Sequence, residues 1–237
     1  MHATLLHHCL PLTHEPATLL QRNLRNNLSV SRVVLSFGTS NRREQDVAGY
    51  RIKQVETLYE GWRKLLKITV QMPDGRIMSR EVLNSTDAAA VLPYDPERRT
   101  VILIRQFRAP VMHVEGHADL LEAVAGLLDG DGPEACAKRE TMEEAGLRIA
   151  KLEPVGMAWS APGMTTERLH LFLAPYTAAD RVGEGGGLTE EHEEIEVLEI
   201  SVDELVGLLN QGSIADMKTL ALIQALQLRH PELFDRA

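Results

Sequence analysis

Four charged side chains lie close together in the stretch RETMEEAGL, residues 139–147. On an α-helix Glu140 and Glu144 are four residues apart and share one face, and Glu143 lies beside them. Like charges at this spacing destabilise a helix by roughly 0.2–0.5 kcal/mol per pair unless a positive charge lies among them. A divalent cation such as Mg²⁺ or Mn²⁺ would reverse the sign of this interaction. A solvated acidic helix face is the alternative, and the spacing alone favours it.

The helix that must hold these carboxylates is marked clearly in the sequence. Helical periodicity extends over residues 133–145, with Pro133 tolerated in the first turn. Asp131 or Gly132 is placed to cap the start of the helix, and Gly146 is suited to end it. We therefore expect the acidic side chains in the second half of a helix over residues 133–145.

Strands are expected on both sides of this helix. Residues 50–95 alternate between apolar and polar positions in short runs, with Pro73-Asp74-Gly75 as a turn, which is typical of a small antiparallel sheet. Other strands are expected in RTVILIRQFRAP (99–110), in ADLLEAVAGLL (118–128, one short strand), and at about residues 152–159, 167–174 and 194–201; helices are expected at about 202–210 and 216–228. Many strands with few helices predict an α/β fold with helices on the faces of a mixed sheet.

The composition excludes several classes of protein. The chain has 237 residues, is 44% hydrophobic and carries a formal net charge of −9, whereas a binder of nucleic acid or acidic membranes normally shows a basic face. No apolar run approaches the roughly 20 residues that span a bilayer. Cys9 and Cys136 are too few for a disulfide framework and fit a reducing compartment. We expect a soluble, cytoplasmic protein that binds neither nucleic acid nor membrane.

Residues 1–45 differ in composition from the rest of the chain, since they contain Arg but no Lys. They are interpreted either as an organelle-targeting segment or as an extension without a structural role. Four histidines would suggest a metal site, but their irregular spacing favours disorder; they are His2, His7, His8 and His14. We therefore expect a poorly ordered extension outside the fold.

The longer stretch AGLLDGDGPEACAKRETMEEAGL, residues 125–147, resembles the Nudix box. Six positions match the second half of that motif in register: Arg139, Glu140, Glu143, Glu144, Gly146 and Leu147. The first half departs from it. Ala125 occupies the glycine position and Gly126 comes one residue late, while Asp131 or Gly132 replaces the first Glu and Thr141 replaces an aliphatic residue. The departures put a role for the first Glu in doubt and leave the metal-binding half intact.

Several other blocks are similar to the nucleotide-sugar branch of the Nudix hydrolases, and most closely to bacterial GDP-mannose hydrolases. They are LIRQFRAP, LLEAVAGLLD, SAPGMTTE, GGGLTEEHEEIEVLEI and KTLALI. The resemblance implies the α/β/α Nudix sandwich over residues 85–237, preceded by a β-rich segment over residues 46–84. In relatives that segment is exchanged between two chains, so the resemblance also implies a homodimer.

The resemblance further implies catalytic roles for individual residues. Glu140, Glu144 and the backbone carbonyl of Ala125 correspond to metal ligands, and Arg139 corresponds to a residue that orients a Glu. A further catalytic and metal-binding Glu lies on a loop in relatives, and Glu193 matches it best; Glu191 and Glu194 are competing assignments. Gly185, Gly186 and Gly187 are expected to give this loop flexibility, although such a run is more often plain linker.

Substrate contacts are implied in the same way. They are Arg108, Glu167 and Lys218, with Trp62, Arg80 and Glu81 reaching the nucleotide from across the dimer. An arginine suits bidentate contact with phosphate, whereas a strand aromatic such as Trp62 is more often a core residue. Glu122, on the strand that enters the motif, is interpreted as a residue that supports the site.

The expected function is Mg²⁺-dependent hydrolysis of a nucleoside diphosphate sugar to a nucleoside monophosphate and a sugar phosphate, with Mn²⁺ as a substitute metal. GDP-mannose is the favoured substrate, and an ADP-ribose or UDP-sugar pyrophosphatase is the alternative. A non-catalytic Nudix-fold sensor of nucleotide sugars is the rival from another class, but the intact Arg139, Glu140, Glu143 and Glu144 speak against it. A third interpretation, in which the acidic helix is only a dimer surface, predicts no metal binding.

Overall fold

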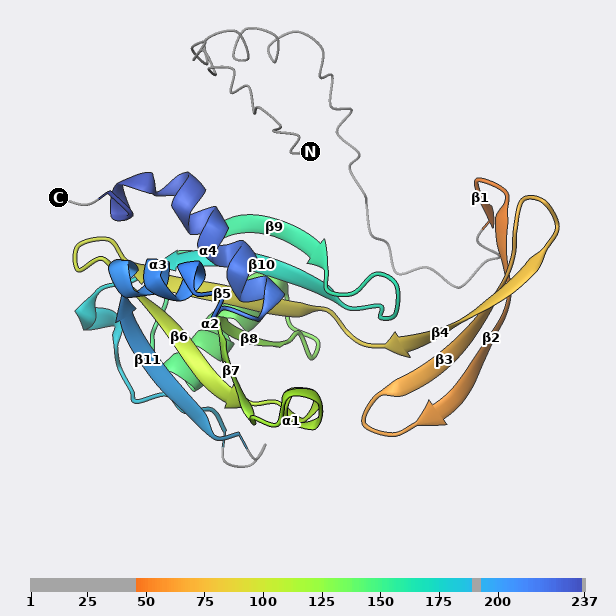
Figure 1. Cartoon of the computed structure of the whole chain (residues 1–237), viewed down its shortest axis with the longest axis horizontal. Coiled ribbons are helices and arrows are strands. Elements are labelled where there is room, and N and C mark those ends of the chain that lie inside the picture. Colours follow the sequence, from red (N-terminus) through yellow and green to blue (C-terminus); the bar gives the residue numbers. More distant parts are fainter. Residues whose placement is uncertain (1–45, 189–192, 236–237) are drawn as a thin grey trace, which may run out of the picture. The chain divides into compact units, whose positions relative to one another are not determined.

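The computed structural model describes residues 46–188 and 193–235. Two β-sheets contain most of the secondary structure (Figure 1). The chain divides by its internal contacts after Arg43, and everything below belongs to the unit from Glu44 onward. The expectations for residues 1–45, including the four histidines and the targeting segment, lie outside the described residues. Within the described part, no helix combines the length and apolar character needed to cross a bilayer.

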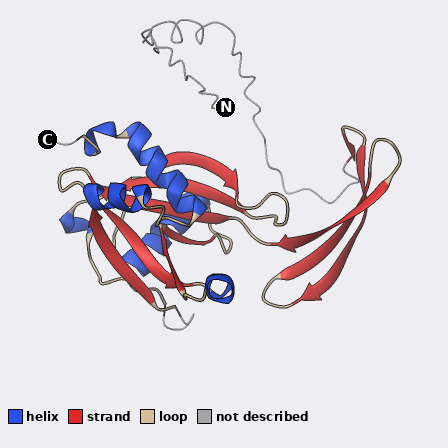
Figure 2. Cartoon of the chain, in the orientation of Figure 1, coloured by secondary structure: helices blue, strands red, loops and turns tan. Residues whose placement is uncertain are grey.

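The first sheet is antiparallel and has the order β1 (Asp46–Val47), β2 (Tyr50–Glu60), β3 (Lys64–Gln71) and β4 (Ile77–Asn84). The predicted Pro73-Asp74-Gly75 turn joins β3 to β4, where the Gly75 N–H donates to the Met72 carbonyl over 2.9 Å. Figure 2 shows residues 46–84 as strand and turn without a helix. Many apolar side chains of this sheet are therefore exposed, among them Val47, Tyr50, Val55, Leu58, Tyr59 and Ile77.

The second sheet has the order β11-β6-β5-β10-β9, with β7 added to β6 and β8 added to β5. Its strands are β5 (Ala88–Asp95), β6 (Thr100–Phe107), β7 (Asp119–Glu122), β8 (Val124–Leu127), β9 (Glu153–Trp159), β10 (Arg168–Pro175) and β11 (Ile195–Ser201). β5 and β10 run parallel, and the other pairs are antiparallel. The predicted mixed sheet is thus confirmed.

Period-two alternation on the central strands produces two separate cores. Leu92 on β5 and Leu103 on β6 face one core, whereas Val91 and Ile102 face the other. Helix α2 (Pro133–Ala145) packs in the second core, while α3 (Val202–Asn210) and α4 (Met217–Arg229) pack in the first. This arrangement is the three-layer α/β/α sandwich that the family resemblance implies, and the boundaries of α2 match those predicted from the helical period.

Two local predictions were wrong, and three short helical elements of the described chain were not predicted. The antiparallel sheet expected over residues 50–95 ends at Asn84, because β5 belongs to the second sheet. The stretch ADLLEAVAGLL forms two strands, because β7 pairs with β6 and β8 turns away at Ala123 to pair with β5. A short helix, α1 (Ala109–Glu115), follows the RQFR block and was not predicted. It buries no residue, so it leaves no apolar periodicity in the sequence. The 3-10 turns η1 (Ala178–Asp180) and η3 (Pro231–Leu233) were not predicted either, because a three-residue element is too short to show a helical period.

Candidate active site

A cavity of about 550 Å³ lies where the predicted site residues converge. Its lining comes from the loop after β8, from α2, from the start of α4, from β9 and β10, and from the turn between β2 and β3. Eight predicted residues line it: Trp62, Arg108, Ala125, Arg139, Glu140, Glu167, Glu193 and Lys218. The fold therefore gathers side chains separated by more than 150 positions in the chain.

Glu144 lies behind this cavity and is almost completely buried, with 2% of its surface exposed. One carboxylate oxygen accepts a 3.0 Å hydrogen bond from the Ala125 N–H on β8. β8 itself is fixed by pairing with β5, where Ala125 lies opposite Ala90. Glu140, one turn earlier on α2, has 12% of its side chain exposed and lines the cavity. The end of α2 and the backbone of β8 thus define one buried anionic site.

The burial of these carboxylates is electrostatically unfavourable. The pKa of Glu144 is raised to about 8, mainly by burial and also by the charges of Glu140 and Glu193, while the Ala125 hydrogen bond opposes the rise. The pKa of Glu140 is raised to about 7, mainly by burial; Arg139 opposes the rise, whereas Glu143 and Glu193 contribute to it. A bound cation would relieve this repulsion, and carboxylate oxygens are the ligands that Mg²⁺ prefers.

The donor set for a metal ion is only partly composed of side chains. Among the described residues, no three His, Cys, Asp or Glu side chains are arranged to hold a metal ion together. Glu140 and Glu144 would supply two ligands of a metal ion, and backbone and substrate oxygens would supply the others. Because Mg²⁺ usually retains waters and binds phosphate oxygens beside one or two carboxylates, the residues present fit it.

Gly126 has a steric role that the sequence did not reveal. A Cβ atom at this position would lie 1.9 Å from a carboxylate oxygen of Glu140. The glycine that comes one residue late in the motif therefore provides the space in which Glu140 lies against β8. The preceding position needs no glycine, because Ala125 contributes only its backbone.

Arg139 holds together the acidic groups around the helix. Its guanidinium lies 2.8 Å from Glu140 and donates to Glu143 over 2.9 Å and to the Leu127 carbonyl over 3.2 Å. A longer contact of 3.3 Å reaches Asp131, one of the two residues that could replace the first Glu of the motif. Arg139 thus orients carboxylates and links them to the loop after β8.

The two predicted phosphate-binding cations share one buried partner. Glu122 is 2% exposed and accepts hydrogen bonds from Arg108 over 2.6 and 3.0 Å and from Lys218. Burial alone would raise the pKa of Glu122, but Arg108 and Lys218 hold it below its usual range. Lys218 also lies 3.1 Å from Asp216. Two carboxylates therefore balance the two cations, so the local positive charge is smaller than the sequence suggested.

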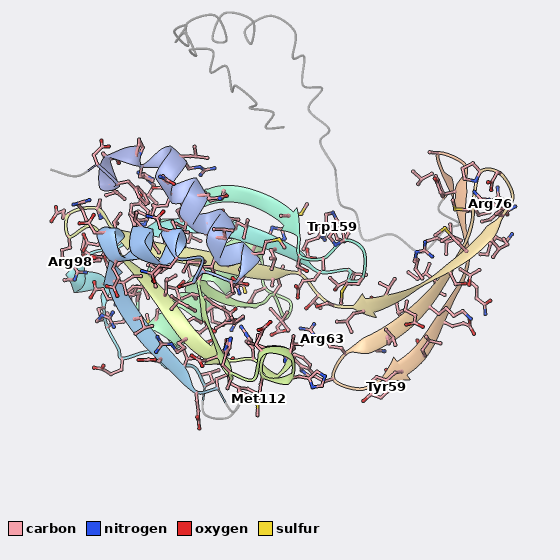
Figure 3. All side chains as sticks on the ribbon, in the orientation of Figure 1. Tyr59, Arg63, Arg76, Arg98, Met112 and Trp159 are labelled. Atoms are coloured by element: carbon pink, nitrogen blue, oxygen red, sulfur yellow. The ribbon has the colours of Figure 1, made fainter. Side chains whose placement is uncertain are left out.

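A second wall of the cavity is formed by aromatic and polar residues. The Arg63 guanidinium stacks 4.5 Å from the centroid of Trp62, which is 88% exposed and therefore not a core residue. Ser85 accepts from Arg63 and donates to Glu167 over 3.3 Å. Figure 3 shows Arg63 at the β2–β3 turn and Trp159 at the end of β9.

The residues that line the cavity differ in part from the predicted substrate contacts. Arg80 and Glu81 lie on β4 and do not line this cavity in the described chain. Arg63 and Trp159 line it but were not predicted, since no chemical motif surrounds either residue. Only proximity in the folded chain identifies them.

Glu193 is the described loop carboxylate that lines the cavity, whereas Glu194 does not line it. The Leu188 N–H donates to the Glu193 carboxylate over 3.3 Å. The charge of Glu193 acts on both Glu140 and Glu144. Glu191 lies outside the described residues.

Comparison with known proteins agrees with this geometry. The NUDIX domain model matches residues 84–222. A GDP-mannose pyrophosphatase of Cronobacter sakazakii is 46% identical over 178 residues, which cover 73% of this chain and 92% of the relative. The protein of the same name from Yersinia enterocolitica is 40% identical over 179 residues, with the same two coverages, 73% and 92%.

The fold also matches a solved structure. The crystal structure of an ADP compounds hydrolase superposes with a TM-score of 0.64, covering 81% of this chain and 98% of that chain at 18% sequence identity. At this identity the likeness supports the fold alone. The domain match and the relatives, together with the carboxylates of α2, place the chain in the Nudix family of hydrolases.

Proposed function

We propose that this protein hydrolyses the diphosphate bond of a nucleoside diphosphate sugar, with GDP-mannose as its preferred substrate. The observation that carries the proposal is the group of buried Glu144 and partly buried Glu140 and Glu193, beside the cation pair of Arg108 and Lys218. Two relatives are named GDP-mannose pyrophosphatase, which supports GDP-mannose as the substrate over other nucleotide sugars. ADP-ribose and UDP-sugars are the alternatives.

Glu140, Glu144 and the Ala125 carbonyl would hold Mg²⁺, with Glu193 as a further ligand or as a base. When bound, Mg²⁺ neutralises phosphate charge and lowers the pKa of a water molecule. Mn²⁺ has similar preferences for oxygen ligands and is expected to substitute.

The protein residues then have separate tasks. Arg108 and Lys218, held in place by Glu122, contact the phosphates of the substrate. The oxygen of the attacking water bonds to phosphorus while Glu193 accepts a proton from that water. The bond from that phosphorus to the bridging oxygen breaks, and the bridging oxygen leaves on the other phosphate. The products are a nucleoside monophosphate and a sugar phosphate.

A homodimer is part of this proposal. The first sheet exposes several apolar side chains and no helix covers it in the described chain, which is a common property of interaction surfaces. A second copy seated on this sheet would cover them. Arg80 and Glu81, which do not line the cavity of their own chain, would then reach the cavity of the partner. The expected cytoplasmic location stays a prediction.

Substrate cleavage is the direct test of the proposal. With Mg²⁺, we expect the highest kcat/KM for GDP-mannose in a panel with UDP-glucose, ADP-ribose and NADH, with GMP and mannose 1-phosphate separated by ion exchange. Glu144→Gln removes a buried charge that the metal needs and should lower kcat at least about 100-fold. Glu134→Gln makes the same change at an exposed position in the first turn of α2 and should retain activity. Tight binding without cleavage of any compound would instead indicate a sensor.

The raised pKa values of Glu140 and Glu144 predict how stability depends on pH without metal. A carboxyl whose pKa is raised by folding stabilises the folded protein most at pH values below its unfolded-state pKa. This stabilisation is lost as pH rises through the folded-state pKa of about 7 to 8. Between pH 5 and 9 the metal-free wild type should therefore lose stability on the order of a few kcal/mol. Glu144→Gln should lose less, and Mg²⁺ should raise the Tm of the wild type more than that of the variant at pH 8. Parallel Tm curves for the two proteins, measured by differential scanning fluorimetry, would contradict this account.

Oligomeric state can be tested with matched substitutions. Light scattering should give twice the chain mass of 26.3 kDa for the wild type. Leu58→Asp places a charge on the exposed face of β2 and should shift the protein toward monomer. Leu228→Asp makes the same change at a more exposed apolar residue of α4 and should leave the dimer intact. A wild-type monomer at micromolar concentration would refute the dimer.

A further inference from the structure

The segment of residues 182–187 is attached to the C-terminal end of α2 through backbone atoms. The N–H groups of Val182 and Gly183 donate to the Gly146 carbonyl over 2.9 and 3.2 Å. Gly186 donates to the Glu144 carbonyl over 2.9 Å, and Gly187 to the Glu143 carbonyl over 3.1 Å. These bonds satisfy carbonyls that the last turn of a helix otherwise leaves without partners. We call residues 183–187 the glycine strap.

Gly185 is the position at which the strap comes closest to the helix. A Cβ atom on Gly185 would lie 2.4 Å from the Glu144 carbonyl oxygen and 2.8 Å from the carbonyl carbon of Ala145. Both neighbours are backbone atoms of α2, which cannot rotate away as the end of a side chain can. The φ of Gly185 is +74°, a conformation that also favours glycine. The strap therefore lies directly on α2 at this position, while the flexibility expected of its glycines stays a prediction.

The other end of the strap holds the segment that carries Glu193. The Ile195 N–H donates to the Gly186 carbonyl over 3.3 Å, and the Glu193 N–H donates to the Leu188 carbonyl over 3.4 Å. Ile195 begins β11, which is paired with β6 along its whole length. Glu193 is thus held between two fixed elements, the strap on one side and the sheet on the other.

A continuous set of contacts therefore joins the backbone of Glu144 to the side chain of Glu193. The Glu144 carbonyl binds Gly186, Gly186 binds Ile195, and the Glu193 carboxylate accepts from Leu188 directly after the strap. Glu193 also packs against Gly187, where a Cβ atom would lie 2.6 Å from its carboxylate. The spacing between the loop carboxylate and the two helix carboxylates is consequently set by how closely the strap lies on α2.

We propose that Gly185 is a positioning residue for the reaction: its missing side chain lets the strap dock on α2, and the docked strap fixes Glu193 relative to Glu140 and Glu144. The inference rests on the proposed hydrolase function and deepens it. Displacing the strap would separate the base from the helix carboxylates without altering any side chain that contacts substrate.

A double-mutant cycle tests this proposal. Gly185→Ala should lower kcat for GDP-mannose at least tenfold while KM changes by less than about threefold, because only the placement of Glu193 is disturbed. In a Glu193→Gln background the same substitution should have almost no further effect on kcat. Gly212→Ala, at φ +69° with open space around its Cβ, is the control for the backbone conformation and should keep kcat. Equal loss of kcat in both backgrounds, or wild-type kcat in Gly185→Ala, would overturn the proposal.

Amide hydrogen exchange gives a readout that does not depend on activity. The Gly186 and Gly187 amides should exchange slowly in the wild type and rapidly in Gly185→Ala, whereas Gly212→Ala should leave them slow. Fast exchange of both amides in the wild type would refute the docking even if Gly185→Ala does not fold. Slow exchange together with an inactive wild type would refute the hydrolase function and, with it, the positioning role, while leaving the docked strap itself intact.

Discussion

The arrangement of the site depends on one unfavourable interaction, the burial of like charges at the end of α2. Glu144 is buried with its carboxylate against the backbone of β8, and Glu140 lies one turn away in the space left by Gly126. Burial of unpaired carboxylates is costly unless they are protonated or neutralised. The fold tolerates this cost because β5 and β8 hold one side of the pair and the packed core under α2 holds the other. A cation would bind here more tightly because it removes the repulsion between Glu140 and Glu144.

Charge balance around the cavity follows the same logic. Glu122 compensates Arg108 and Lys218, so these cations are held in fixed positions and add little net charge. Arg139 pairs with Glu140 and Glu143 on the opposite side. In the proposed function, an acidic protein can bind an anionic diphosphate because a metal ion and two positioned cations would act at short range, whereas salt screens the overall charge of −9 over longer distances. Cations held in this way would also stabilise the charge that develops during bond cleavage.

Sequence reasoning predicted those parts of this structure that leave a periodic or local signal. The boundaries of α2 follow from its helical period and from Gly146, and the β-branched run of residues 99–110 predicts the strand β6. Helix α1 was not predicted because it buries nothing.

At the site, the motif identified Glu140 and Glu144, but the pairing of Arg108 and Lys218 with Glu122 depends on a long-range contact between β7 and α4 that no spacing encodes. The packing roles of Gly126 and Gly185 were not predicted for a similar reason, since they depend on the atoms that surround each glycine in space.

Calorimetric titration of Mn²⁺ into the metal-free protein tests most directly whether the buried carboxylates form a cation site. The wild type should bind Mn²⁺ at pH 8, and Gly126→Ala should bind it at least about tenfold more weakly, because the added methyl group displaces the Glu140 carboxylate. The fold should persist in this variant, since the atoms displaced are the free end of a side chain. Absence of binding to the wild type, or equal affinity in Gly126→Ala, would contradict the account.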